Sequence, residues 1–186
     1  MRLRRVVSSV NLQTNDFDLF GLSAVFAQDR AGLETRWKAL QREAHPDNFS
    51  THGASAQRLS MQWSVRINEA YQRLKDPLKR AAYLCELNGC PIKAEDNTAM
   101  PAVFLMQQME WREALDDAIE VCELERLNDQ VRLERQRTLE LCSQLIDFQH
   151  DFLEAAQQVR ALMFIERFAN DVEKKLDQID AASLGQ

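Results

Sequence analysis

Glycine and proline are scarce in this chain of 186 residues, which contains five glycines and four prolines. Neither residue occurs between positions 102 and 184. A sheet protein needs tight turns, and those turns depend largely on glycine, proline and asparagine. The long stretch without glycine or proline therefore argues against a sheet and favours long helices.

Long apolar runs and metal-ligand spacings are also missing. No apolar run approaches the ~20 residues of a membrane helix, and the arginine-rich N-terminus lacks the apolar segment of a secretory signal. The three histidines and four cysteines form neither a C-x-x-C pair nor a zinc-site spacing. Cys85, Cys122 and Cys142 fall in predicted helices, which fits reduced thiols. We expect a protein of a cytosol-like compartment with no metal, no cofactor and no membrane partner.

Positive charge is in short supply in the second half of the chain. The formal net charge is −6, and residues 90–186 carry ten basic against twenty acidic side chains. Residues 16–89 are nearly neutral, and residues 1–15 carry three arginines and no acid. Binding to nucleic acid needs clustered lysine and arginine for the phosphates, so nucleic acid is not an expected partner.

Two amphipathic patterns separated by a polar loop occupy the first half. Apolar residues recur at steps of three and four along residues 30–44 and again along 54–75, which predicts two helices. Pro46 ends the first helix, because a proline displaces the residue before it from helical backbone. The predicted buried faces consist of Leu33, Trp37, Leu40 and Ala44 in the first helix, and Trp63, Ile67, Ala70, Tyr71 and Leu74 in the second.

Shorter helices are expected on either side of this hairpin. Residues 17–22 predict one or two helical turns that Gly21 closes. Asp76-Pro77 is typical of a helix start, an N-cap followed by a first-turn proline, and Asn88-Gly89 of a helix end. Residues 90–100 contain two prolines and polar side chains, which is typical of a linker.

Three helices are predicted after Pro101. The first is expected to reach about Arg126, a break near 127–129 leads to the second, and the third begins near Asp151. This pattern favours a three-helix bundle, with a long coiled-coil hairpin as the alternative. The predicted apolar stripes are Phe104, Trp111, Leu115, Ala118 and Cys122; Leu141, Leu145 and Phe148; and Leu162, Ile165, Ala169, Val172, Leu176 and Ile179.

The tripeptide His45-Pro46-Asp47 stands at the exit of the first long helix. Its proline turns the chain out of the helix, so the histidine and aspartate are expected to project from an exposed loop. Arg36, Lys38 and Arg42 lie on the polar face of that helix. A basic face beside an exposed carboxylate suits the binding of a protein that carries its own acidic and arginine sites. Alone, the tripeptide could equally be a helix stop followed by a turn.

The first C-terminal helix carries a second face beside its apolar stripe. Met106, Met109, Glu110, Glu113 and Asp117 fall at helical spacing, and Leu105 is also apolar. An apolar patch that grades into a row of acids is unusual for a helix that buries one stripe, and methionines suit an adaptable contact surface. A wide core face with a solvated acidic edge is the alternative.

Phe164 lies off the apolar stripe of the third helix, because a helix turns by about 100° per residue. Its ring could join the patch of Met106 and Met109, or it could pack inside a wider bundle.

The order of these segments resembles a J-domain over residues 16–88. The Phe-Gly-Leu opening and the Arg-Ala-x-Tyr-Leu segment are similar to the HscB family, the iron–sulfur assembly co-chaperones, and the glycine-free C-terminus extends the likeness over nearly the whole chain. Asn48 departs from the lysine of many J-domains, and the cysteine segment of some eukaryotic relatives is missing. The segments that carry the resemblance are Phe17-Asp18-Leu19-Phe20-Gly21-Leu22, His45-Pro46-Asp47, Ile67-Asn68-Glu69-Ala70-Tyr71-Gln72-Arg73-Leu74 and Asp76-Pro77-Leu78-Lys79-Arg80-Ala81-Ala82-Tyr83-Leu84.

The resemblance implies an all-α protein in four parts. These are a flexible tail (1–15), a J-domain (16–88), a linker (89–100) and a three-helix scaffold-binding domain (101–183). The J-domain would dock on an ATP-hydrolysing heat-shock chaperone of the HscA/DnaK class and raise its hydrolysis rate. Asp47 would compete for an arginine of that chaperone, and His45 and Pro46 would hold the loop in shape. Docking would be steered by Arg36, Lys38 and Arg42.

The same resemblance implies a second partner, the iron–sulfur scaffold protein IscU. In the family, the corresponding face of the C-terminal domain binds this scaffold. The matching positions are Leu105, Met106, Met109, Glu110, Glu113, Asp117 and Phe164.

Other functions fit the sequence less well. In an enzyme, His45 with Asp47 could form an acid–base pair, and Cys142 with His150 a nucleophile pair. Residues that flank a proline need not face each other, and Cys142 and His150 are two helical turns apart. For these reasons we do not expect an enzyme. A helical adaptor with a degenerate J-domain, or a general J-domain co-chaperone with a different client, remains as the alternative to the scaffold-specific function.

Overall fold

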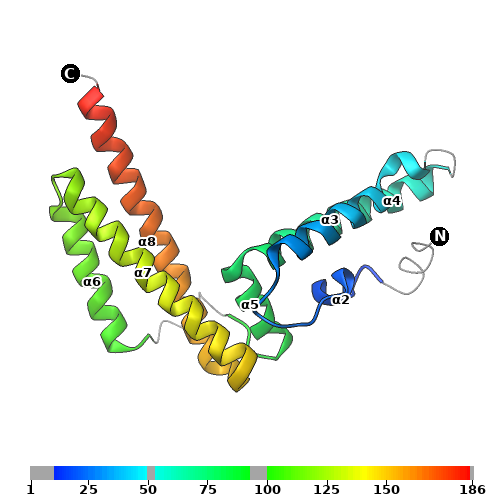
Figure 1. Cartoon of the computed structure of the whole chain (residues 1–186), viewed down its shortest axis with the longest axis horizontal. Coiled ribbons are helices and arrows are strands. Elements are labelled where there is room, and N and C mark those ends of the chain that lie inside the picture. Colours follow the sequence, from blue (N-terminus) through cyan, green and yellow to red (C-terminus); the bar gives the residue numbers. More distant parts are fainter. Residues whose placement is uncertain (1–10, 50–52, 93–99, 185–186) are drawn as a thin grey trace. The chain divides into compact units, whose positions relative to one another are not determined.

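The computed structural model describes residues 11–49, 53–92 and 100–184. The secondary structure of these residues is helical without a strand, so the predicted all-α fold is confirmed (Figure 1). The chain divides into two compact units, Met1–Leu84 and Cys85–Gln186, and each is described by itself. Most of the expected tail (1–10), part of the polar loop (50–52) and most of the expected linker (93–99) lie outside the described residues.

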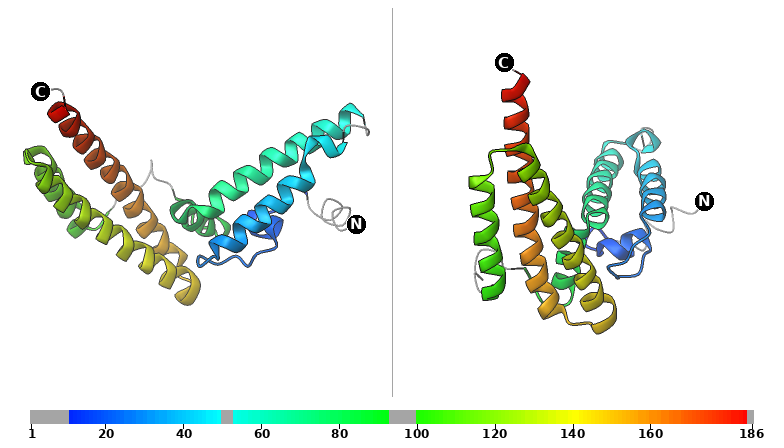
Figure 2. Two further views of the ribbon diagram at one scale, coloured as in Figure 1. Left: turned by 45° about the horizontal axis from the view of Figure 1, so that its top comes forward. Right: turned by 60° about the vertical axis from the view of Figure 1, so that its left-hand side comes forward.

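An antiparallel helical hairpin forms the centre of the first unit (Figures 1 and 2). It consists of α3 (Arg30–Ala44) and α4 (Ala54–Lys75), which have the bounds that the sequence predicts, joined through the 3-10 turn η1 (Pro46–Phe49). Asp29 starts α3, because its carboxylate accepts hydrogen bonds from the first backbone amides of the helix. The buried positions of the two facing sides are Leu33, Ala44, Ser60, Trp63, Ile67, Ala70 and Leu74. Trp37, Leu40 and Tyr71, which were predicted to be buried, are half-buried.

Two short helices complete this unit, although the second of them continues past its boundary at Leu84. Helix α2 (Asp16–Phe20) ends at Gly21, whose φ of 60° lies in the left-handed region that favours glycine. Helix α5 (Pro77–Leu87) begins after Asp76, whose carboxylate accepts from the amides of the first turn. These are the starts and stops that the sequence predicts.

A buried carboxylate joins the N-terminal segment to α4. Asp16 is fully buried. Its Oδ1 atom lies 2.6 Å from the guanidinium of Arg66, and its Oδ2 atom lies 3.1 Å from that of Arg73. Arg66 also donates to the backbone carbonyls of Leu12 and Thr14. The end of the segment that we expected to be a flexible tail is thus held against α4.

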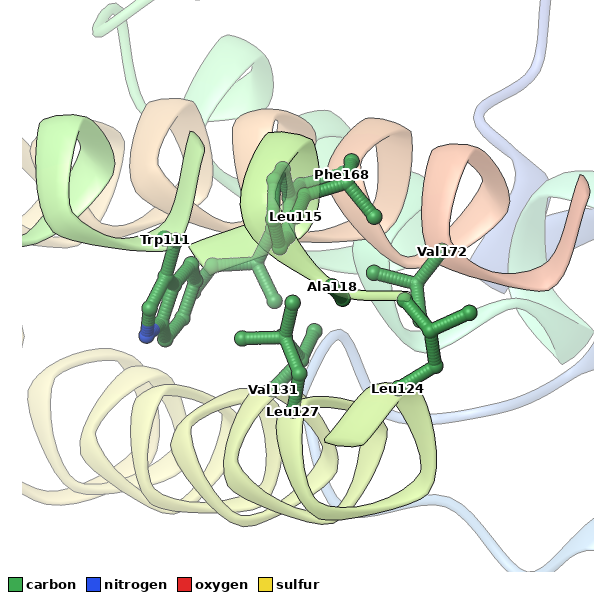
Figure 3. Packing of buried hydrophobic residues seen from close by; sticks show 9 residues of the cluster. Trp111, Leu115, Ala118, Leu124, Leu127, Val131, Phe168 and Val172 are labelled. Carbon is green, nitrogen blue, oxygen red and sulfur yellow. The ribbon is translucent and has the colours of Figure 1, made fainter. Parts of the chain in front are cut away.

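The second unit is a bundle of three helices, α6 (Ala102–Asp117), α7 (Val121–Ser143) and α8 (Phe152–Leu184). They lie side by side in both figures of the fold (Figures 1 and 2). Figure 3 shows side chains from all three helices meeting in one core. The buried members of this core are Trp111, Leu115, Ala118, Leu124, Leu127, Val131, Ile165, Phe168 and Val172.

The break between the first two bundle helices was predicted at the wrong place. Helix α6 ends at Asp117 rather than near Arg126, and the predicted break at 127–129 lies inside α7. Glu120 explains the difference. Its side chain accepts from the amide of Glu123, whose carboxylate accepts in turn from the amide of Glu120, and this capping box starts a new helix.

The apolar stripes predicted for the first two bundle helices are also wrong at three positions. Cys122 is exposed, since it follows the new helix start, and Leu141 and Phe148 are also exposed. Helix α7 passes into a π-helical turn, η2 (Gln144–Gln149), whose wider winding changes the periodicity on which the prediction depended. Leu145 is buried as predicted.

Candidate functional site

The His-Pro-Asp loop lies where α3 gives way to η1. His45 has extended backbone, with φ −61° and ψ 130°, and Pro46 opens the 3-10 turn. The side chains of His45 and Asp47 are 59% and 88% exposed. Both side chains therefore project from the surface of the first unit.

These two side chains face each other across the proline. The Nδ1 atom of His45 lies 3.4 Å from Oδ2 of Asp47 and 3.3 Å from the backbone nitrogen of Asp47. A neutral ring accepts from this amide through Nδ1, whereas a protonated ring contacts the carboxylate. In either state the imidazole restricts the conformation of Asp47.

Hydrogen bonds from polar side chains fix the end of α3 from which the loop projects. The Nδ2 group of Asn48 donates to the carbonyl of Arg42 at 2.8 Å, and the hydroxyls of Ser60 and Ser64 both donate to the carbonyl of Ala44 at 3.1 Å. The last carbonyls of α3 thus find partners outside the helix. Sequence reasoning missed these three residues, although buried Ser60 lies three residues before Trp63 on the core face of α4.

The three basic residues of α3 that were predicted to steer docking do not form one free basic face. Arg36 donates to the carbonyls of Phe20 and Gly21 at 2.6 and 2.5 Å. Lys38 pairs with Glu34 at 2.6 Å, which raises the pKa of the lysine and lowers that of the glutamate. Arg42 is exposed, and its guanidinium has no ion-pair partner in the part of the chain that the structure describes.

The second candidate site is the outer face of α6. Met106 and Met109 are 63% and 65% exposed, and Leu105 is 43% exposed. Glu110, Glu113 and Asp117 continue this face as exposed acids toward the C-terminal end of the helix. Trp111, on the inner side, stacks on Phe168 of α8 at 5.4 Å between ring centroids. This stacking orients the methionines and acids away from the core.

Phe164 packs against the edge of the bundle core. Its ring meets Phe104 of α6 edge-on at 5.8 Å and stacks on Phe168 at 6.1 Å between centroids. The side chain is half-buried. It therefore lies at the seam between α6 and α8, with part of its ring open to solvent.

The geometry does not support Cys142 and His150 as a nucleophile pair. Cys142 is fully buried, and burial raises the pKa of its thiol to about 12, which makes it a poor nucleophile. The Nδ1 atom of His150 lies 3.0 Å from the carbonyl of Ile146. Within the described ranges, no group of three or more histidine, cysteine or acidic side chains is arranged to hold a metal ion.

A membrane-spanning helix would need greater length or more apolar character than any helix among the described residues has.

Comparison with known proteins identifies the family. Residues 100–173 match the model of the HSCB C-terminal oligomerisation domain. The HscB homologue of Burkholderia multivorans, a co-chaperone, is 47% identical over 174 residues, which are 92% of this chain and 99% of the relative. The homologue of Burkholderia thailandensis is 45% identical over 174 residues, which again cover 92% of this chain and 99% of the relative. The chain belongs to the HscB family.

Solved structures agree with this assignment. The chaperone HscB from Vibrio cholerae matches 89% of this chain and 99% of its own, with a TM-score of 0.76 and 37% identity. The human co-chaperone HscB matches 92% of this chain and 84% of its own, with a TM-score of 0.79 and 28% identity. The expected resemblance to the iron–sulfur assembly co-chaperones and the expected function as a co-chaperone are therefore confirmed.

Proposed function

We propose that this HscB-family protein stimulates an ATP-hydrolysing heat-shock chaperone of the HscA/DnaK class and delivers the scaffold protein IscU to it during iron–sulfur cluster assembly. One observation carries the first half of the proposal. Asp47 presents an 88% exposed carboxylate on a loop whose backbone is anchored by Asn48, Ser60 and Ser64. A charged group that is already ordered loses little entropy when it binds a partner.

The mechanism assigned to the loop is electrostatic competition. Asp47 pairs with an arginine of the chaperone, and this charge-assisted contact shifts the chaperone toward hydrolysis only because it is stronger in one state than in the other. His45 and Pro46 keep the carboxylate in position. No side chain of this chain takes part in the chemical step, so the protein is not an enzyme in this proposal.

The basic residues of α3 contribute unequally to the electrostatic attraction of the chaperone. Arg42 is exposed beside the loop and attracts an acidic partner surface. Lys38 contributes less, because Glu34 already neutralises it. Arg36 acts indirectly by holding the end of α2 in place.

The outer face of α6 is the proposed scaffold-binding site. Met106 and Met109 with Leu105 offer an adaptable apolar surface, and the acids Glu110, Glu113 and Asp117 offer negative charge for a basic partner. Phe164 contributes the exposed part of its ring and supports Phe104 from behind. A J-domain (16–88) joined by a linker (89–100) to this domain (101–183) raises the effective concentration of scaffold at the chaperone.

The deciding experiment is a single-turnover ATPase assay of the cognate chaperone with and without purified scaffold. We expect this protein to accelerate hydrolysis alone, and more strongly with scaffold. Asp47→Asn should abolish the acceleration while leaving the fold and scaffold affinity intact. Glu69→Gln, which removes an exposed acid of α4, is the matched control. Full stimulation by Asp47→Asn would overturn the proposed role of the loop.

The same assay separates the alternatives. A general J-domain co-chaperone would stimulate hydrolysis equally with or without scaffold, and an adaptor with a degenerate J-domain would not stimulate it at all. We place the protein in the bacterial cytosol, because its bacterial relatives are co-chaperones and its four cysteines are free thiols.

A further inference from the structure

Helix α5 ends in a complete Schellman motif. The amide of Cys90 donates to the carbonyl of Cys85 at 2.9 Å, and the amide of Gly89 donates to the carbonyl of Glu86 at 3.0 Å. Gly89 has a φ of 78°, in the left-handed region. These are the two nested hydrogen bonds and the left-handed residue that define the motif.

The motif brings two particular side chains together. The third residue from the helix end and the second residue beyond the cap lie close together, and an apolar contact between them frequently accompanies the motif. In this chain both positions are cysteine, Cys85 and Cys90. The direct hydrogen bond between their backbones limits the separation of the two Cα atoms to under about 7 Å. A disulfide needs Cα atoms that are about 4.4–6.8 Å apart.

We infer that Cys85 and Cys90 are a redox-active thiol pair that closes to an intramolecular disulfide. Both cysteines are free thiols in the structure. The electrostatics are consistent with this geometry: burial, and after it the neighbouring Cys90, raise the pKa of the Cys85 thiol to about 11.

Exposure sets the order of the two chemical steps. Cys85 is fully buried and Cys90 is half-buried, so a small disulfide of the glutathione type reaches Cys90 first. The Cys90 thiolate attacks this oxidant and releases one reduced thiol. The sulfur of Cys85 then attacks the Cys90 sulfur of the mixed disulfide and displaces the second thiol. Two protein thiols thereby give up two electrons and two protons, and the oxidant is reduced to two thiols.

The raised pKa of Cys85 makes the second step slow at neutral pH, because only the thiolate attacks. The short distance compensates in part, since the reaction is intramolecular. The disulfide would link Cys90 covalently to the last turn of α5 and so fix the direction in which the chain leaves this helix. The closed loop is short, so the gain in global stability is small and the effect is local.

The test is redox equilibration of the full-length protein in glutathione buffers at pH 8. Free thiols are then alkylated under denaturing conditions, and the peptides are mapped by mass spectrometry. We expect a disulfide that links Cys85 to Cys90, with the loss of two hydrogen atoms. Cys90→Ser should abolish it, and Cys122→Ser, which removes an exposed thiol, should leave it unchanged.

Hydrogen exchange on the wild-type protein provides a readout that requires no substitution. The amides of Gly89 and Cys90 should exchange more slowly after oxidation, because the disulfide protects their hydrogen bonds. Three results would overturn the inference. These are a disulfide that maps to Cys142, a mixed disulfide that persists on Cys90 without closing, and full alkylation of Cys85 after equilibration in oxidising buffer.

Discussion

The ammonium group of Lys175 on α8 donates to the backbone carbonyl of Leu115 in the last turn of α6. A second contact reaches the carbonyl of Asp116 at 3.2 Å. Helix α6 has no basic residue in its last turn, and Asp116 and Asp117 place negative charge at the negative end of its dipole. The neighbouring helix thus supplies the positive charge that α6 lacks at its acidic end.

Removal of this contact should loosen the acidic end of the proposed scaffold-binding face. We expect Lys175→Met to lower the free energy of unfolding by about 1 kcal/mol, to speed amide exchange in the last turn of α6 and to weaken scaffold binding. Lys175→Arg should restore all three. Lys174→Met removes a more exposed ammonium on the same helix and serves as the control. Normal exchange at the end of α6 in Lys175→Met would contradict the positioning role.

The methionine face can be tested without disturbing the core. Met106→Ala combined with Met109→Ala should weaken scaffold affinity, measured by calorimetry, by tenfold or more (about 1.4 kcal/mol). Both side chains are more than half exposed, so stability should change little. Stimulation of the chaperone ATPase in the absence of scaffold should stay normal. Leu153→Ala, an exposed position on α8, is the matched control, and unchanged affinity in the double variant would refute the assignment.

The buried carboxylate of Asp16 should be important for the stability of the first unit. Asp16→Asn keeps the shape but leaves Arg66 and Arg73 without their counter-charge, at a cost of about 2–3 kcal/mol in urea unfolding. The cost is moderated because Arg73 is 42% exposed to water. Asp18→Asn, at an exposed position of the same helix, should cost much less. Equal losses in the two variants would show that the buried pairing is unimportant.

Acid should open the turn between α6 and α7. Hydrogen bonds from the amides of Ile119 and Glu120 lower the pKa of Glu123. A carboxyl whose pKa is lower in the folded state stabilises the fold above its unfolded pKa, and this contribution is lost as the pH falls through the folded pKa. Amide exchange at Ile119 and Glu120, extrapolated to a common pH, should therefore accelerate below pH 4.5. Glu123→Ala, which removes the acceptor oxygens, should show fast exchange at every pH.

Local signals in the sequence predicted the first unit closely. Gly21, Pro46 and Pro77 act within one turn of the chain, so α2 and α3 end, and α5 begins, where these residues place them. The turn after α6 was missed, because a glutamate at both capping positions differs from the usual serine or threonine pattern. The π-helical turn was missed because periodicity assumes 3.6 residues per turn.

The candidate sites show the same division between local and distant information. The projection of Asp47 follows from the neighbouring proline and could be predicted. The commitment of Arg36 to two carbonyls of α2 could not be, because its partners are fifteen and sixteen residues away. The packing of Phe164 likewise depends on Phe104, which a different helix supplies.

The two serine hydroxyls that meet at the carbonyl of Ala44 have a mechanical consequence. Ser60 and Ser64 stand one turn apart on α4, so the end of α3 is fastened to two successive turns of the other helix. When a partner binds Asp47, we expect any force on the loop to pass to α4 and not to bend the end of α3. The two helices of the hairpin should therefore move together as one rigid element.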